Sequence, residues 1–542
     1  MFSVTPWITA SIFAAAIVFG IAVVRYLVST QRSKDYPPGP PTLLGVGNLH
    51  QIPLKQPFIK FHEWSKTYGD IIGLKAGPSN IVVLHNTKYV RELLDKRAAI
   101  YSGRPYSYIP AEHVFCQHGD KHILNLQNGP YLRQWRAAVA YLVGPVGLKQ
   151  TVPMQEATAA NLAYKLLDTN PSKTLEHLKH WALATPLLAI SGQRLEDRGS
   201  AFADRFFLAQ KHWLQLLEPG NAPPVDLFPL LRLVPESFAD WKGKARYVRE
   251  YMFEEYFRYL NTAKGLLGKG RPSKGSSSEF RSLMTKILED REQAKDGKEG
   301  ERQFTDDDVA YLGGGLLDAA VDTTWASIMA FVMFMAAYPR IQAKVQEEVD
   351  RLSPEKPPTG DMVDNLVYTR ACLMEIFRFR PPAPNGLPHV LDRDDTFQGY
   401  KIPKGTTILA NVWGIQRNPD EYDRPEEFVP ERFIQHPLGL KPGVAVAEGR
   451  RATYTFGSGR RICPGEQFAQ KSIILAMGKL MWAFDIKASK PLDTSVETGF
   501  HTGLVLGPEP FDVDFGLRES SRKAQVIDDY TSSNAHLDRI IG

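Results

Sequence analysis

One cysteine in a glycine-rich turn carries the clearest chemical signal of the sequence. Cys463 lies within residues 456–465, a turn that also holds two arginines, and an apolar stretch at 467–482 that is typical of a helix follows it. Loop N–H groups, the arginines and the N-terminus of that helix would all stabilise a thiolate. Such a thiolate could bind a metal ion without a second cysteine. The usual interpretation of a lone cysteine, a small buried apolar side chain, is kept for Cys116 and Cys372.

An acid beside a threonine in an apolar stretch is the second chemical signal. Asp322 and Thr323 lie between Thr305, where three following aspartates predict a helix start, and Pro339, which predicts its end. The enclosed helix would be about 50 Å long and mostly apolar, so it should cross a core. A buried carboxylate needs a partner, whereas a threonine in mid-helix often only bonds back to the preceding turn.

Small residues fill the middle of the same helix. Glycines stand at 313–315 and alanines at 319 and 320, although a glycine inside a helix costs ~1 kcal/mol against alanine. Two explanations remain open at this point. Either something flat and bulky approaches the helix here, or another helix packs tightly against it.

The N-terminal segment indicates a membrane anchor. Residues 1–24 contain no charged side chain, and with the next few residues they would form a helix of about 33 Å, enough to cross a bilayer. Arg25, Arg32 and Lys34 follow, and this positive flank predicts a lumenal N-terminus and a cytosolic remainder. A cleaved signal peptide would instead carry its basic residues before the apolar stretch. We therefore expect an uncleaved, single-pass anchor at residues 1–30.

Composition bounds the rest of the chain. With 542 residues, of which 43% are hydrophobic and 23% charged, the protein is long enough for one large domain or two to four ordinary ones. The formal net charge of +5 is too small for its size to indicate a nucleic-acid binder. Three scattered cysteines give no disulfide framework and favour a reducing compartment.

The body of the chain reads as mainly helical with a smaller strand content. Residues 71–84 alternate like a hairpin, and three stretches have the apolar spacing of amphipathic helices: 151–168, 203–217 and 245–264. We expect a proline-rich hinge at 31–44 and one catalytic domain at 45–518, because no interdomain linker interrupts it. The connection at about 264–304 should be exposed and partly mobile. The polar tail at 519–542 should be poorly ordered.

The cysteine turn resembles the haem-thiolate signature of the cytochrome P-450 superfamily. That signature is Phe-x-x-Gly-x-Arg-x-Cys-x-Gly, and its fixed places are filled by Phe456, Gly459, Arg461, Cys463 and Gly465. A chance match by composition has odds on the order of 10⁻⁴ or less. The chain looks most like microsomal members, and among them like fungal ones that oxidise secondary-metabolite intermediates.

Further family motifs follow in the expected order. Glu375 and Arg378 match a Glu-x-x-Arg helix, where the two side chains share a face, and Arg432 resembles the arginine that completes an ion-paired triad. Residues 319–324 resemble the distal oxygen-binding motif, with Ala320 where the family most often has glycine. The resemblance extends from the anchor to about residue 511.

The resemblance implies a fold and a cofactor. The fold would be the cytochrome P-450 fold, mainly α with a smaller β portion, preceded by one transmembrane helix. The cofactor would be haem b, iron protoporphyrin IX, with Cys463 as the axial iron ligand and Phe456 packed near the sulfur. Partners for the haem propionates would be the following: Trp135, Arg136, His389 and Arg461. A further arginine common in the family is Val139 here, which leaves Arg133 as a substitute.

The resemblance also implies an activity. The protein would insert one oxygen atom from O2 into a lipophilic small molecule, with Asp322 and Thr323 delivering protons. Electrons would come from NADPH through a membrane-bound NADPH–cytochrome reductase, with cytochrome b5 as a further donor, at the endoplasmic reticulum membrane. A basic docking surface for the reductase would comprise Arg133, Arg136, Arg450, Arg451, Arg460 and Lys471. The substrate pocket would be lined by Leu316, Ala319, Ala320, Ala383, Leu387, Phe500 and Thr502.

Other classes of function stay open on the sequence alone. A haem-thiolate protein can rearrange peroxides as an isomerase, or bind haem without activating O2, and the chain could also be a membrane-tethered binding module. A cluster of His113, Cys116, His118 and His122 could form a zinc site, although its spacing fits no common zinc pattern. The intact Asp322–Thr323 pair favours oxygen activation.

Overall fold

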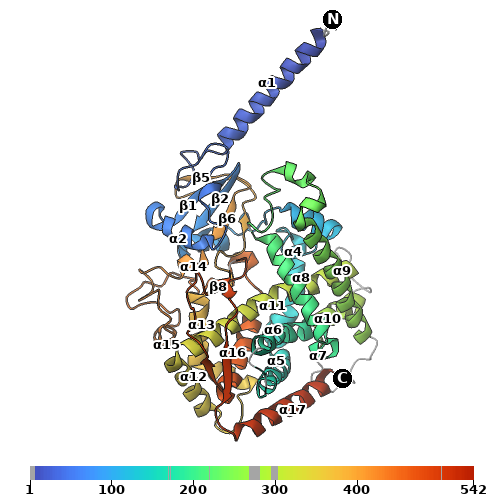
Figure 1. Cartoon of the computed structure of the whole chain (residues 1–542), viewed down its shortest axis with the longest axis vertical. Helices are drawn as coiled ribbons and strands as arrows, with labels where there is room; N and C mark the ends of the chain where they lie inside the picture. Colours follow the sequence, from blue (N-terminus) through green and yellow to red (C-terminus); the bar gives the residue numbers. More distant parts are fainter. Residues whose placement is uncertain are drawn as a thin grey trace.

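The computed structural model describes residues 6–168, 170, 173–218, 220–267, 281–293, 303–501 and 503–541. It has one mostly helical body, from which helix α1 (Pro6–Ser29) projects (Figure 1). By length and composition, one helix among these residues could cross a membrane, but it is α11 (Asp306–Ala337), which is mostly buried inside the protein. The described apolar part of α1, Phe13–Ser29, is shorter. The membrane crossing expected at residues 1–30 therefore rests on the sequence.

A small sheet lies at the end of the body nearest α1 (Figure 1). Strands β1 (Ile71–Ala76) and β2 (Ser79–Leu84) form the predicted hairpin, which the pairing of Ile71 with Leu84 confirms. Strand β6 (Thr407–Ala410) runs parallel to β2, and β3 (His389–Val390) runs antiparallel to β6. The sheet order β1-β2-β6-β3 thus carries His389 from late in the chain to the N-terminal region.

Helices make up most of the body. The expected helices at 203–217 and 245–264 are confirmed within α8 and α9, and the one at 151–168 is confirmed in α5, which ends at Leu166. The longer helices, besides α1 and α11, are α2 (Pro57–Tyr68), α4 (Pro130–Val143), α5 (Pro145–Leu166), α6 (Thr174–Ser191), α8 (Ser200–Leu217), α9 (Asp240–Leu267), α10 (Leu283–Gln293), α12 (Pro339–Leu352), α13 (Val367–Phe379), α16 (Glu466–Ala483) and α17 (Arg522–Ile541).

Short elements connect these helices. The short helices and helical turns are η1 (Leu49–Gln51), α3 (Thr87–Val90), η2 (Arg91–Lys96), η3 (Ile109–Phe115), η4 (Cys116–His118), α7 (Leu195–Arg198), η6 (Pro229–Leu233), η7 (Glu236–Phe238), η9 (Gly360–Asn365), α14 (Val412–Ile415), α15 (Glu431–Gln435) and η10 (Gly459–Arg461). The remaining strands are β4 (Asp395–Phe397), β5 (Tyr400–Ile402), β7 (Phe484–Ala488), β8 (Phe500–His501), β9 (Gly507–Pro508) and β10 (Val513–Leu517).

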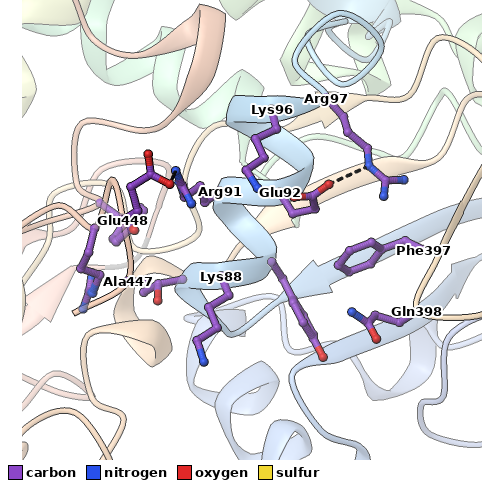
Figure 2. Close-up of a pocket in the computed structure, with 13 residues that line it drawn as sticks. Lys88, Arg91, Glu92, Lys96, Arg97, Phe397, Gln398, Ala447 and Glu448 are labelled. Carbon is purple, nitrogen blue, oxygen red and sulfur yellow. Dashed lines mark hydrogen bonds and ion pairs between the residues drawn. The ribbon is translucent and has the colours of Figure 1, made fainter. Parts of the chain in front are cut away.

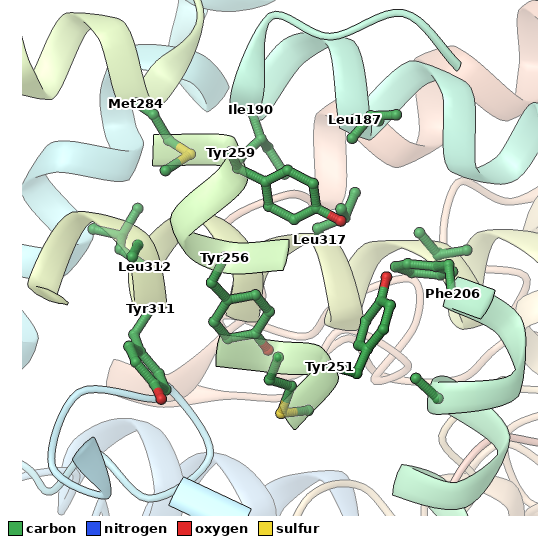
Figure 3. Packing of buried hydrophobic residues seen from close by; sticks show 14 of the residues in the cluster. Leu187, Ile190, Phe206, Tyr251, Tyr256, Tyr259, Met284, Tyr311, Leu312 and Leu317 are labelled. Atoms are coloured by element: carbon green, nitrogen blue, oxygen red, sulfur yellow. The ribbon is translucent and has the colours of Figure 1, made fainter. Parts of the chain in front are cut away.

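Helix α11 crosses the core, as its start and stop signals predict. Thr305 and Asp308 form a reciprocal capping box: the Asp308 N–H donates to the Thr305 hydroxyl, and the Asp308 carboxylate accepts from the Thr305 N–H at 2.8 Å. One apolar cluster packs α4, α8 and α9 around its first half and includes Tyr256 and Leu317 (Figure 3). A second cluster packs α5, α12, α13 and α16 around its second half.

The surroundings of the small residues in α11 show which of the two explanations left open by the sequence applies to each. A Cβ at Gly313 would collide with Met284 of α10, and a Cβ at Gly314 would collide with the Tyr256 ring of α9. These glycines therefore serve close packing of neighbouring helices. Ala319, by contrast, is exposed to open space within the fold. Close packing of other helices therefore explains Gly313 and Gly314, whereas the later turn at Ala319 leaves room for a flat group beside the helix.

Two expectations about the chain's polar segments need correction. The tail at 519–542 was expected to be poorly ordered, but its described part, 519–541, contains α17, which packs on α5 with Tyr530 stacked on Tyr164 at 4.2 Å between ring centroids. The connection at 264–304 lies partly outside the described residues, but its described part contains α10, whose Leu283 is buried rather than exposed. Both helices have a narrow apolar stripe that their overall polar composition conceals.

Candidate functional site

The cysteine turn is held in shape by backbone contacts. Gly459 has φ +64°, and a Cβ there would collide with the Leu94 carbonyl oxygen, so the position requires glycine. The Cys463 N–H donates to the Phe456 carbonyl at 2.8 Å. The Phe456 ring meets Phe377 of α13 edge to face, with 5.2 Å between the ring centroids. The turn therefore fixes Cys463 just before the first residues of α16.

Cys463 lies in an unusual environment for a thiol. Its side chain borders open space on one side, yet protein atoms crowd it on the others, and this burial raises its pKa to about 11. The Gly465 N–H and Arg136 favour the anion, but they do not outweigh burial. The loop N–H thus acts on the sulfur in the direction that the sequence predicts, but burial opposes it more strongly. A positive charge against the sulfur is needed, and a coordinated metal ion deprotonates a thiol outright.

One face of α11 borders open space. Leu316, Ala319, Ala320 and Thr323, which are spaced along one helical face, are exposed or half-buried, whereas most of the helix is buried. The Thr323 hydroxyl donates to the Ala319 carbonyl at 3.1 Å. Helix α11 packs on α16, the helix that follows Cys463. The interior is thus open at the face where the sequence predicts oxygen binding.

Asp322 does not share that open face. Its side chain is buried, its Oδ2 has no hydrogen-bond partner among the described residues, and burial raises its pKa to about 6. Lys179 of α6 opposes this rise through its positive charge. The predicted pair therefore has its hydroxyl toward the open space and its acid toward α6.

A group of basic side chains gathers near Cys463 without a matching number of acids. Arg104, Arg136, Arg461 and His389 come from four separate segments, and the Arg136 Nη1 donates to the Ile462 carbonyl at 2.8 Å. Burial, with help from the neighbouring cations, lowers the pKa of Arg104 to about 9, of Arg461 to about 10 and of His389 to about 3. At Arg461 the carboxylate of Asp392 opposes this lowering, because its negative charge favours the charged guanidinium.

Several buried donors near Cys463 have no hydrogen-bond partner among the residues that the structure describes. They are the Arg104 Nε, the Arg461 Nη1 and the Trp135 Nε1. Buried donors are normally satisfied, and leaving one unmade costs about 1–3 kcal/mol. The cations and the free donors together form a site for a ligand that carries more than one negative charge.

Comparison with known proteins identifies the family to which these features belong. The sequence profile of cytochrome P-450 matches residues 37–515. Cytochrome P-450 monooxygenase grgG of a Penicillium species is 35% identical over 98% of this chain and 96% of its own length. A cytochrome P-450 monooxygenase of Arthrobotrys oligospora is 33% identical over 96% of each chain. Cytochrome P-450 monooxygenase atE of Aspergillus terreus is 31% identical over 96% of this chain and 94% of its own length.

The chain belongs to the cytochrome P-450 family. It is a haem-thiolate monooxygenase whose cofactor is haem b, and it requires O2, an electron-donating redox partner and a small-molecule substrate. The residues present fit this cofactor. A haem b carries two propionates, which suit the buried basic side chains and the donors without a partner among the described residues, and the positive charge of its iron would offset the burial that raises the pKa of Cys463.

Glu375 of α13 joins two arginines in a buried ion-pair triad in this cytochrome P-450. The Arg378 Nε donates to Glu375 at 2.7 Å, and the Arg432 Nε lies 3.0 Å from the same carboxylate. All three side chains are buried. Arg378 also donates to the carbonyls of Pro425, at 2.8 Å, and Glu427, at 2.9 Å. The triad therefore ties α13 to the segment that leads into the cysteine turn.

The residues expected to line the pocket differ in their exposure. Ala383 is half-buried and Leu387 is 37% exposed, so each reaches open space. The expectation for Phe500 is wrong: the side chain is 2% exposed and packs against Phe334 and Arg380 in the core. Thr502 lies outside the described residues. Strand β8 turns Phe500 inward because side chains alternate along a strand.

The cluster of His113, Cys116, His118 and His122, for which the sequence left zinc binding open, does not converge: among the described residues no three His, Cys, Asp or Glu side chains are placed to hold a metal ion. His118 faces Asp307 at 3.4 Å, and His122 is buried and stacked on Phe115. Cys116 is exposed. In the expected reductase surface, Arg133 and Arg460 are exposed, whereas Arg450, Arg451 and Lys471 are ion-paired with acids.

Arg104 is the site residue that sequence reasoning missed. It follows Gly103, which pairs with Val390 as an isolated β-bridge, and this pairing brings it beside His389. The Arg104 Nη1 donates to the Pro388 carbonyl. The link spans almost three hundred residues of chain, so no local spacing could have revealed it.

A surface cavity of about 480 Å³ lies elsewhere, between η2, β4 and the 447–454 loop (Figure 2). Its lining is charged, with Arg91 paired to Glu448 at 3.0 Å and Arg97 paired to Glu92 at 3.2 Å. It includes none of the residues expected to bind haem or substrate. The site is therefore assigned by its chemistry and not by cavity size.

Proposed function

We propose that this cytochrome P-450 is a membrane-anchored monooxygenase that inserts one oxygen atom from O2 into a lipophilic secondary-metabolite intermediate, with Cys463 as the axial ligand of the haem iron. The observation that carries this proposal is the combination of a crowded thiol that borders open space with buried basic side chains that outnumber the acids near them. Haem b, when bound, supplies the activation of O2 at its iron.

The propionates of the haem would be held by Arg104, Arg136, Arg461, His389 and Trp135. Burial and the two nearest arginines lower the pKa of His389 to about 3, and the negative charge of a propionate would oppose this lowering, so that its Nε2 would carry a proton and donate to the propionate. Its Nδ1 lies 2.7 Å from the Tyr101 carbonyl, which directs the Nδ1–H to that oxygen. The arginines would supply the charge, and the Trp135 Nε1 an additional hydrogen bond.

Thr323 and Asp322 would move protons toward the oxygen site. Thr323 borders the open face of α11, and its hydroxyl needs only to rotate away from the Ala319 carbonyl to donate in the other direction. Asp322 has a pKa of about 6, close to neutral pH, as a group that both takes up and releases protons requires.

Membrane anchoring is supported by apolar surface at one end of the molecule. Residues 220–239 lie at the end of the body from which α1 projects (Figure 1). Within them, Leu230, Leu233 and Phe238 are each more than three-quarters exposed. Such a patch favours contact with a lipid surface. The anchor would hold the domain on the cytosolic face of the endoplasmic reticulum, where NADPH–cytochrome reductase and cytochrome b5 would donate electrons.

The substrate class follows from the lining and the relatives. Leu316, Ala319, Ala320, Ala383 and Leu387 offer apolar contact to a substrate. The relatives reported above come from fungi and are named monooxygenases. A lipophilic intermediate of fungal secondary metabolism fits both observations.

The proposal is tested with the full-length protein in membranes. Haem-thiolate ligation is measured by the spectrum of the reduced, carbon-monoxide-bound form, and candidate substrates are screened by the shift of the haem absorption band. NADPH-dependent O2 consumption and product formation with the reductase then test the activity. A thiolate spectrum with substrate turnover but no O2 consumption would replace this proposal by a peroxide-rearranging isomerase.

A further inference from the structure

A second buried aspartate stands one helical turn before Asp322. Asp318 of α11 is 8% exposed, and its two oxygens accept hydrogen bonds from different helices. The Gln210 Nε2 of α8 donates to Oδ1 at 2.8 Å, and the Tyr256 hydroxyl of α9 donates to Oδ2. Figure 3 shows the Tyr256 ring in the apolar cluster together with Leu317 and Tyr251. None of the motifs recognised in the sequence includes Asp318.

Asp318 and Asp322 form a carboxyl pair in apolar surroundings. Side chains four residues apart on a helix are neighbours, with about 5–6 Å between their Cβ atoms. The Asp322 Oδ2 is buried without a partner among the described residues. One cation, Lys179 of α6, acts on Asp322, and its Nζ lies 4.2 Å from the centroid of the Phe207 ring. A single partly buried cation cannot offset two buried negative charges.

The other groups that face the pair do not change this balance. The groups facing Asp318 from α9 are the hydroxyls of Tyr251, Tyr256 and Tyr259, which burial keeps neutral. Asp204 and Lys211 of α8 act on Lys179 with opposite signs. Burial, with the charge of Asp322, raises the pKa of Asp318 to about 7, above that of Asp322. Asp318 is therefore the member that keeps its proton longer as the pH rises.

We propose that Asp318 is a positioning residue for proton delivery, and that its carboxylic acid reloads Asp322 with a proton after Asp322 has released its own toward Thr323. In this step Asp318–COOH and Asp322–COO⁻ become Asp318–COO⁻ and Asp322–COOH. Solvent then returns a proton to Asp318, so the pair ends as it began. Gln210 and Tyr256 each donate one hydrogen bond to Asp318, and either bond alone still ties the carboxyl to a neighbouring helix. This inference rests on the proposed function, because it assigns proton delivery to Asp322.

The test compares Asp318→Asn with two matched variants in the haem-loaded, full-length enzyme. Asp318→Asn keeps the size and the acceptor oxygen but removes the acidic proton. Gln210→Leu and Tyr256→Phe each remove one hydrogen bond to Asp318 and leave its acid in place. If Asp318 only clamped α8 and α9 to α11, the two bond-removing variants would reproduce the defect of Asp318→Asn.

The first readout does not depend on turnover. Infrared difference spectra of the resting enzyme, recorded across a pH change from 5 to 8 in roughly half-unit steps around the pKa of Asp318, follow the carbonyl stretch of protonated carboxyls. We expect the last such band to titrate to be lost in Asp318→Asn and kept in Gln210→Leu and Tyr256→Phe. A band that persists unchanged in Asp318→Asn overturns the proposal.

The second readout is the coupling of electrons to product. For Asp318→Asn we expect an unchanged carbon-monoxide spectrum and a loss of product per NADPH on the order of tenfold, with the missing electrons recovered as peroxide. The two bond-removing variants should form product per NADPH within about twofold of the wild type. Each loses one neutral hydrogen bond, while Asp318 keeps its proton. Equal coupling in wild type and Asp318→Asn overturns the inference. A wild type without the thiolate spectrum would instead overturn the proposed function.

Discussion

At the scale of single residues, burial decides which groups carry charge. Cys463 is a neutral thiol in the protein alone, since its pKa is about 11 and neither Arg136 nor the Gly465 N–H compensates for its burial. The same burial affects Arg461, whose pKa falls to about 10. A neutral thiol and poorly compensated cations become favourable together once a metal ion and two carboxylates are added.

Replacement of the thiol should therefore remove the thiolate signature and leave the fold in place. We expect Cys463→Ala to lose the spectrum of the carbon-monoxide-bound haem thiolate completely, because no other described cysteine is near the site: Cys372 is buried in the core and Cys116 is exposed. Cys116→Ala is the control and should keep the full spectrum. A retained thiolate spectrum in Cys463→Ala would contradict the assignment of the ligand.

Thr323 allows a second prediction at this scale. Thr323→Ala removes the hydroxyl on the open face of α11, which otherwise bonds only back to the Ala319 and Ala320 carbonyls of the preceding turn, so haem content and stability should change little. Product formed per NADPH should fall by about tenfold or more, with a matching rise in peroxide. Thr324→Ala, which removes the adjacent hydroxyl, should couple normally. Unchanged coupling in Thr323→Ala would count against its role in proton transfer.

The buried carboxyl pair predicts how stability depends on pH. Asp318 and Asp322 have folded-state pKa values of about 7 and about 6, above the value near 3.9 expected for an unfolded chain. The folded state therefore binds more protons, and the stability this gives is present below about pH 4 and is lost as the pH rises to about 7. Over this pH range the free energy of unfolding of Asp318→Asn should fall less than that of the wild type, by on the order of 3 kcal/mol. Thermal unfolding at a series of pH values measures this difference. Parallel declines in both proteins would contradict the assigned pKa values.

At the scale of elements, α11 shows how a helix is shaped by its neighbours. Gly314 faces the Tyr256 ring of α9, which is itself fixed by its bond to Asp318. Gly265 of α9 has no heavy atom within 4 Å of a Cβ that would be added there. Both glycines have a helical backbone conformation, but only Gly314 has a bulky side chain packed against it.

Substitution of these two glycines should therefore have opposite effects. Gly314→Ala should lower the free energy of unfolding by about 1–3 kcal/mol, because the buried ring cannot move away and overpacking outweighs the gain in helix propensity. Gly265→Ala should raise it by up to about 1 kcal/mol, since propensity acts alone. Chemical denaturation of both variants checks the signs. A stabilised Gly314→Ala would mean that the α9–α11 contact is looser than the structure indicates.

Local spacing predicted some elements and missed others. The hairpin at 71–84, the start and end of α11 and the cysteine turn all depend on residues close in sequence, and each was predictable from them. Arg104 and Phe500 depend on strand pairing and on the inward face of a short strand, which the sequence does not specify. Asp318 was missed because its two partners come from helices separated from it in the chain.

At the scale of the whole molecule, ion pairs attach the C-terminal helix and the residues just before it to the core. Arg518 and Arg522 both bind Asp350 of α12, at 2.6 Å and 2.9 Å, and Lys479 of α16 binds Asp529 of α17 at 2.5 Å. These contacts lie partly beyond residue 515, where the match to the family profile ends. The C-terminal helix is thus tied to the core by ion pairs that lie partly outside the profile match.

The N-terminal helix is the opposite case, because α1 projects away from the body (Figure 1). Its side chains from Phe13 onward are mostly exposed, so its removal costs the core little contact. We expect a chain lacking residues 1–30 to keep the carbon-monoxide-bound thiolate spectrum and its thermal stability. It should, however, leave the membrane fraction on washing with high salt, unlike the full-length chain. Retention of the shortened chain on membranes after that wash would show that the exposed patch of Leu230, Leu233 and Phe238 is sufficient, and a further variant with these three residues changed to Ser should then release it.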